Sequence, residues 1–187
     1  MRPILITGRL STGKSVASDF FTRQYSHRKF SMASWLKYAI TQHYEIDSIH
    51  KNMEINGKSI RKIMQQVGMY MRMVDINWHV DEVIKQIKAG YFEKKFVIDD
   101  VRFVNEVENL KQFHPIVIKL ECDKLKRVER AILRDNRVPS EEELNDISES
   151  EVDLIKADYT VSNNGDVYDL HQKLGEIYEI EKNRISQ

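Results

Sequence analysis

The chain alternates between short runs of consecutive apolar residues and longer segments in which apolar residues recur every three or four positions. The uninterrupted runs at 4–6 and 96–98 are typical of strands covered on both faces, as at the centre of a parallel sheet, and a further strand is expected at 115–120. Weaker strands are expected at 30–32 and 158–162. The pattern therefore predicts a parallel sheet of about five strands.

Amphipathic segments between these strands predict the helices. We expect them at 14–24, 33–40, 59–75, 77–89, 105–113, 124–134, 148–157 and 167–185. The polar stretch 45–58, with a turn signal at Asn56-Gly57, is expected to be a connection. Strands alternating with helices predict a doubly wound α/β fold with helices on both faces of the sheet, and 187 residues suit a single domain over 1–187.

The stretch Gly8 to Ser15 reads Gly-Arg-Leu-Ser-Thr-Gly-Lys-Ser and lies between the first strand and the first helix. It has the full pattern of a phosphate-binding loop, in which backbone N–H groups surround an anion, Lys14 reaches the terminal phosphates and the Ser15 hydroxyl holds Mg²⁺. The helix N-terminus behind the loop adds a positive dipole. The expected ATP-binding residues here are Gly8, Leu10, Ser11, Thr12, Gly13, Lys14, Ser15 and Val16.

Two carboxylates, Asp99 and Asp100, follow the apolar run 96–98. The carboxyl end of a buried parallel strand is where ligands bind in α/β sheets, and an aspartate there can support Mg²⁺. Successive residues of a strand point to opposite faces, so only one of the two is expected to do so, and Asp100 is our candidate. A helix cap at this junction is the alternative.

One side of the helix expected over 59–75 is apolar, and an adjoining stripe carries two arginines, an amide and a glycine. The members of this stripe are Arg61, Gln65, Gly68 and Arg72. A glycine between arginines leaves room for a bound group to approach the backbone. The alternative is a solvated polar face.

A second basic set follows the strand 115–120. Its members, Arg127, Arg130, Arg134 and Arg137, share one helical face if the helix extends that far. Such a face is either solvated or binds an anion, and the region 124–150 suits a lid.

Composition restricts the partners. Lys and Arg total 29, as do Asp and Glu, so the net charge of zero favours neither nucleic acid nor an anionic membrane. No apolar run approaches a membrane span of about 18 residues. The single cysteine, Cys122, excludes an intramolecular disulfide and suits a reducing compartment, so we expect a cytoplasmic protein.

Four stretches taken together carry a resemblance along nearly the whole chain. They are the phosphate loop; Arg61-x-x-x-Gln65-x-x-Gly68-x-x-x-Arg72 with Asp75-x-x-Trp78; Asp100-Val101-Arg102-Phe103-x-Asn105-Glu106; and Ala157-Asp158-Tyr159-x-Val161-x-Asn163. The combination resembles the deoxynucleoside monophosphate kinases of tailed bacteriophages. Val104 departs from that family, which often has proline there.

The resemblance implies a three-layer fold of the P-loop NTPase type, with an acceptor-binding helical insertion at 33–92 and a small lid at 124–150. It implies ATP- and Mg²⁺-dependent phosphorylation of deoxynucleoside monophosphates to diphosphates for DNA synthesis, in the host cytoplasm for a viral protein. The implied catalytic residues are Lys14, Arg72, Asp100, Arg102, Arg130 and Arg134. The acceptor is expected to contact Lys37, Arg61, Gln65, Gly68, Arg72 and Arg102, with Ser15 and Asp100 at the metal and Asn163 near the adenine.

Several alternatives stay open at this point. Trp35 and Tyr38 belong either to the acceptor base pocket or to the core. A related kinase acting on phosphomevalonate or dephospho-coenzyme A, or an ATP-binding switch without an acceptor, has the same loop. The accepted bases, ribose selectivity and the choice between monomer and homodimer are also open.

Overall fold

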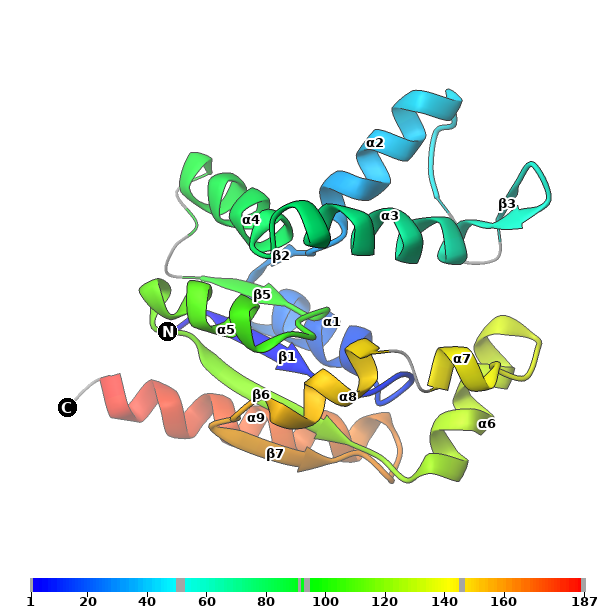
Figure 1. Ribbon diagram of the computed structural model, residues 1–187. Coiled ribbons are helices and arrows are strands. Elements are labelled where there is room, and N and C mark those ends of the chain that lie inside the picture. Colours follow the sequence, from blue (N-terminus) through cyan, green and yellow to red (C-terminus); the bar gives the residue numbers. More distant parts are fainter. Residues whose placement is uncertain (1, 50–52, 91, 93–94, 145–146, 186–187) are drawn as a thin grey trace.

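The computed structural model describes residues 2–49, 53–90, 92, 95–144 and 147–185, with the side chains of 61, 142, 143, 147, 148 and 185 outside that description. Five parallel strands form one sheet in the order β2-β5-β1-β6-β7. They are β1 (Ile4–Thr7), β2 (Arg28–Phe30), β5 (Phe96–Ile98), β6 (Ile116–Glu121) and β7 (Tyr159–Ser162). The α/β fold with a parallel sheet of five strands is therefore confirmed (Figure 1).

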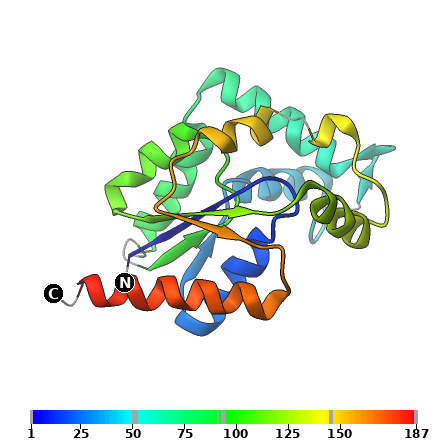
Figure 2. The same cartoon turned by 90° about the horizontal axis from the view of Figure 1, so that it is seen from below.

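Alternation along β1 divides the core into two halves, because successive side chains of a strand point to opposite faces. Ile4 and Ile6 pack with α1 (Lys14–Tyr25) and α9 (Val167–Ile185) on one face. Leu5 belongs to the other half, under α4 (Trp78–Ala89) and α5 (Val104–Leu110), which continues as a 3₁₀ turn at Lys111–Phe113. Figure 2 shows α9, in red, running along one side of the sheet next to α1.

The second strand lies two residues earlier than expected. Arg28, Lys29 and Phe30 pair with β5, whereas we expected a strand at 30–32. β2 is an edge strand whose first two side chains are exposed, so it lacks the continuous apolar pattern of the central strands.

A helical arm is inserted between β2 and β5 (Figure 1). It consists of α2 (Ser34–Tyr44), the hairpin β3 (Glu54–Ile55) and β4 (Lys58–Ser59), and α3 (Ile60–Val74), followed by α4. The hairpin was missed because the stretch is polar; Asn56 and Gly57 form its turn, with φ of 52° and 72°. Residues 50–52 of the expected connection lie outside the described residues.

The region 124–150 contains α6 (Lys124–Asp135) and α7 (Glu141–Leu144), and α8 (Ile147–Leu154) follows. α6 ends at Asn136, whose φ is 51°, so Arg137 lies beyond the helix and does not extend its basic face. Among the described helices, none has the length and apolar character needed to cross a membrane.

Candidate functional site

The stretch Gly8 to Ser15 forms a tight turn between β1 and α1 at the carboxyl edge of the sheet. Gly13 has φ of 98°, and a Cβ there would lie 2.4 Å from Asn163 Nδ2, so the position requires glycine. Asn163, directly after β7, donates from Nδ2 to Thr12 O at 2.8 Å. The loop and the end of β7 therefore fit together at Asn163, and its expected position near the adenine stays a prediction.

Lys14 folds back over the loop. Its Nζ donates to Gly8 O at 2.5 Å and to Arg9 O at 2.8 Å. Desolvation, with a smaller contribution from the positive charge of Arg102, lowers the pKa of Lys14 to about 7. The Ser11 hydroxyl is buried and has no hydrogen-bond partner among the described residues. An unsatisfied hydroxyl and a desolvated ammonium are features that a bound phosphate would satisfy.

The two aspartates after β5 have separate partners. Asp99 is 8% exposed, and its Oδ2 lies 2.7 Å from Ser18 Oγ on α1 and 2.8 Å from Lys29 Nζ. Asp100 accepts from Ser31 Oγ at 2.6 Å and from the Met32 N–H at 2.9 Å, so its carboxylate fixes the start of the arm. Asp100 therefore holds the segment before α2 rather than capping the helix that follows β5, whereas Asp99 faces the helix that carries Ser15.

Arg72, on α3, is held against the start of α5. Its Nη2 donates to Glu106 Oε1 at 2.7 Å, and its guanidinium lies 3.6 Å from the centre of the Phe103 ring. Glu106 is 2% exposed, and its Oε2 accepts from the backbone N–H of Arg102 at 2.8 Å and of Phe103 at 3.1 Å. Burial raises the pKa of Glu106, and the Arg102 backbone donor and Arg72 oppose that rise. One buried carboxylate thus fixes both Arg72 and the backbone of Arg102.

The side chain of Arg102 points to a different carboxylate. Its Nη1 donates to Glu149 Oε1, on α8, at 2.6 Å. Sequence reasoning assigned no role to Glu106 or Glu149. The glutamate three residues after Phe103 was a partial signal for Glu106, because its carboxylate accepts from the Phe103 N–H at the start of α5 as the glutamate of a capping box does.

The stripe on α3 differs in part from expectation. The space over Gly68 is filled by packing within the arm: a Cβ there would lie 3.6 Å from His79 Nε2 and 3.7 Å from Leu36 Cδ2. His79 Nε2 is also 3.0 Å from Gly68 O. The space over Gly68 would admit a methyl group at ordinary contact distance, but it leaves no gap for a ligand. Gln65 is exposed, and the side chain of Arg61 lies outside the described part of the chain.

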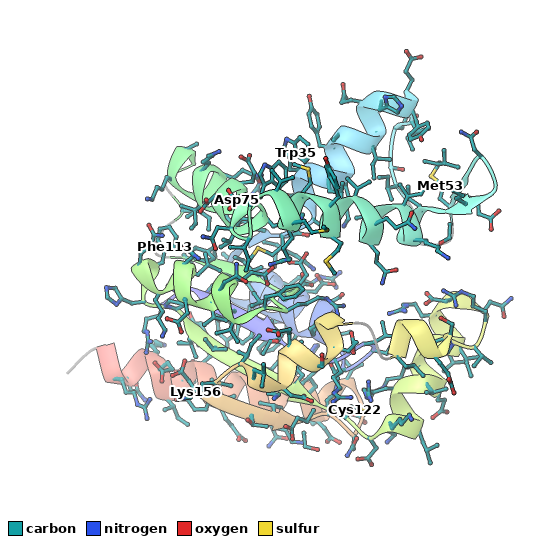
Figure 3. All side chains as sticks on the ribbon, in the orientation of Figure 1. Trp35, Met53, Asp75, Phe113, Cys122 and Lys156 are labelled. Atoms are coloured by element: carbon teal, nitrogen blue, oxygen red, sulfur yellow. The ribbon has the colours of Figure 1, made fainter. Side chains whose placement is uncertain are left out.

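Other residues of the arm are distributed as follows. Lys37 is exposed on α2. Trp35 packs edge-on against Trp78, with ring centroids 4.4 Å apart, at the junction of α2 with the other arm helices (Figure 3). Trp35 therefore contributes to the packing of the arm.

The basic residues of α6 do not act as one surface. Arg130 donates to Asn163 O at 3.0 Å and to Gly165 O at 3.1 Å, while Arg134 pairs with the adjacent Asp135. Arg127 is 7% exposed, and its buried Nη1 has no hydrogen-bond partner among the described residues. Figure 3 shows Cys122 at the end of β6, just before this helix.

A cavity of about 250 Å³ opens between α1, α6 and the start of α9. Its lining is mostly apolar and consists of Gly13, Val16, Arg130, Asn163, Asp166, Val167 and Leu170. An apolar slot with a guanidinium at its wall suits a planar base, and this one adjoins the phosphate loop. Among the described residues there is no cluster of three or more His, Cys, Asp or Glu side chains that would hold a metal ion on its own.

Comparison with known proteins shows the fold. No protein-family model matches the sequence, and no curated protein is significantly similar to it. Solved structures match along most of the chain. A shikimate kinase from Acinetobacter baumannii in complex with shikimate is 19% identical with a TM-score of 0.59, covering 97% of this chain and 95% of that one.

Two further structures give similar values. A sugar kinase from Janibacter sp. HTCC2649 is 9% identical with a TM-score of 0.60, covering 92% of this chain and 91% of that chain. A gluconokinase from Sinorhizobium meliloti 1021 is 9% identical with a TM-score of 0.57, covering 98% and 97%. At such identities the likeness shows the α/β fold of P-loop kinases.

Proposed function

We propose that the protein transfers the γ-phosphoryl group of ATP to the phosphate of a deoxynucleoside monophosphate. One observation carries the proposal: Glu149 accepts hydrogen bonds both from the Leu10 N–H of the phosphate loop and from Arg102 Nη1, so Arg102 lies beside the loop that carries Lys14. Two cationic side chains at one phosphate loop indicate a site for a strongly charged anion. Phosphoryl transfer brings two phosphates together and needs such charge neutralisation.

The triphosphate side of the reaction would use the loop and the apolar slot. Lys14 and the loop N–H groups would bind the phosphates, and the slot lined by Arg130 and Asn163 would hold the adenine. The Ser15 hydroxyl would hold Mg²⁺, which when bound would neutralise charge on the transferring group. Asp99 is the carboxylate we propose to support it, because Asp99 is bonded to Ser18 on the helix of Ser15 while Asp100 is bonded to Ser31 at the start of the arm.

The acceptor side would use the arm and the end of β5. Arg72 and Arg102 would bind the acceptor phosphate as planar forks, each already oriented by a buried glutamate. Arg61, Gln65 and Lys37 are the proposed contacts to the rest of the nucleotide. A phosphate acceptor is mostly dianionic at neutral pH, since its second pKa is about 6, so no general base is needed.

A second candidate is transfer to a small hydroxyl acceptor, because the matching solved structures are named as kinases of shikimate, gluconate and sugars. A hydroxyl acceptor needs a carboxylate placed to take its proton. Both carboxylates after β5 accept hydrogen bonds from other parts of the chain, which favours the phosphate acceptor.

A panel of acceptors with ATP and Mg²⁺, scored by ADP release, tests the proposal. The panel holds the common deoxynucleoside and ribonucleoside monophosphates, phosphomevalonate, dephospho-coenzyme A, shikimate and gluconate. We expect turnover with at least one deoxynucleoside monophosphate. Turnover with a non-nucleotide alone would replace the proposal, and binding of ATP with no acceptor turnover would indicate a switch protein.

A further inference from the structure

Glu149 connects the phosphate loop to Arg102. It lies on α8 and is 3% exposed. Its Oε2 accepts from the Leu10 N–H of the loop at 2.6 Å, and its Oε1 accepts from Arg102 Nη1 at 2.6 Å. These groups are 139 and 47 residues away in the sequence, so only the fold brings them together.

We infer that Glu149 is a positioning residue for phosphoryl transfer, which orients the guanidinium of Arg102 beside the phosphate loop. This inference rests on the proposed function, because it assigns to Glu149 a part in the same site. Glu149 is not expected to touch either substrate, and its effect passes through Arg102.

The geometry supports a fixed orientation for Arg102. Its backbone N–H is held by Glu106 and its Nη1 by Glu149, so both ends of the residue are attached to buried carboxylates. A guanidinium carries five N–H donors in a rigid plane, and a carboxylate along one edge sets the direction of the others. The Arg102 side chain remains 28% exposed and is therefore accessible to an acceptor.

The charges support the same role. The positive charge of Arg102 repels that of Lys14 and lowers the pKa of Lys14. Glu149 opposes this, because its negative charge raises the pKa of Lys14. The buried carboxylate of Glu149 therefore offsets part of the repulsion between Arg102 and Lys14 before the phosphates arrive.

A second contact holds α8 to the loop but is weaker. Arg9 pairs with Asp153 on the same helix, with side chains 42% and 46% exposed. An exposed ion pair of this kind contributes little to stability, because water screens its charges. The attachment of α8 to the loop therefore depends chiefly on the buried carboxylate of Glu149.

The test is a mutant cycle on acceptor turnover, with Glu149→Gln, Arg102→Ala and the double variant. Glutamine keeps an oxygen for the Leu10 N–H but removes the charge that orients Arg102. We expect Glu149→Gln to lower kcat about 100-fold, as for a misplaced catalytic group, with ATP affinity by calorimetry within about threefold of wild type. The double variant should be no more than about threefold slower than Arg102→Ala, since both changes remove the same contribution.

Controls separate a positioning role from a general loss of structure. Glu151→Gln makes the same charge change two residues along α8 and should leave kcat within about twofold of wild type. If Glu149→Gln unfolds, as judged by thermal melting, Glu149→Asp replaces it in the cycle: the charge stays but the reach is shorter, and kcat should again fall.

A measurement without turnover distinguishes failure of the inference from failure of the proposed function. The NMR order parameter of the Arg102 Nε–H should be about 0.8 in the wild-type protein and should fall below about 0.6 in Glu149→Gln. Equal order in both proteins would overturn the inference, whatever the acceptor panel shows. An unchanged or higher kcat in Glu149→Gln would also overturn the inference. A higher kcat would indicate that Glu149 blocks the phosphate loop in the wild-type protein. A wild-type protein inactive on every acceptor contradicts the proposed function alone.

Discussion

Binding of ATP should draw a proton onto Lys14. In the free protein, desolvation and Arg102 lower the pKa of Lys14 to about 7, from an ordinary value of 10.5. Phosphates placed against the ammonium group would return the pKa to its ordinary range or above it. Protons are then taken up on binding between pH 7 and 10.5, so ATP affinity should be lost as the pH rises above 7.

The magnitude follows from the two pKa values. At pH 8 about one tenth of the free Lys14 is protonated, so binding takes up about 0.9 proton; at pH 6 the uptake is about 0.1 proton. Calorimetry of Mg²⁺-ATP binding in buffers with different ionisation enthalpies measures this number directly. Lys14→Arg is the control, because arginine keeps the charge without titrating in this range.

Uptake by the wild-type protein at pH 8 of less than about 0.2 proton would refute the reasoning. So would equal uptake in the wild-type protein and in Lys14→Arg, since the proton would then belong to the nucleotide or to another group.

Three further outcomes are expected. Arg72→Ala should lower kcat/KM for the acceptor, by an amount that corresponds to a loss of about 2–4 kcal/mol of transition-state stabilisation, while calorimetry shows unchanged ATP binding. A selective loss of ATP binding would contradict the assignment of Arg72 to the acceptor phosphate. His27 is 1% exposed, and burial lowers its pKa to about 4 from 6.5. Between pH 6.5 and 4 the unfolded chain therefore binds a proton at His27 that the folded protein does not bind, so the folded protein should lose stability as the pH falls through this range. Urea unfolding should show up to about 3 kcal/mol of this loss in the wild-type protein and less in His27→Phe; identical pH profiles would refute it. Gly13→Ala should abolish ATP binding because its Cβ would meet Asn163, whereas Gly175→Ala, whose nearest neighbour would be 3.8 Å away, should bind normally in the same calorimetric titration.

The central strands were predictable because burial on both faces leaves continuous apolar runs, as at 96–98. β2 and the hairpin at 54–59 were not, because an edge strand and a two-residue turn carry mostly polar side chains. A regular pattern of apolar residues arises where a segment buries side chains in the core, and β2 and the hairpin bury few side chains.

In the candidate site too, some residues could be predicted from the sequence and others could not. The phosphate loop is a local motif, so Lys14 could be identified from its neighbours in the sequence. Glu149 acts through partners on distant elements, and no local spacing reports them. Gly68 was misinterpreted for a related reason: its helix position was right, but the residue that fills its space, His79, comes from another helix.

The most direct test of the account follows the γ-phosphoryl group itself. ³¹P NMR of a reaction with ATP, Mg²⁺ and an equimolar mixture of deoxynucleoside monophosphates should show one deoxynucleoside diphosphate formed for each ADP. ADP appearing with inorganic phosphate, and with no deoxynucleoside diphosphate, would contradict a second phosphate site formed by Arg72 and Arg102.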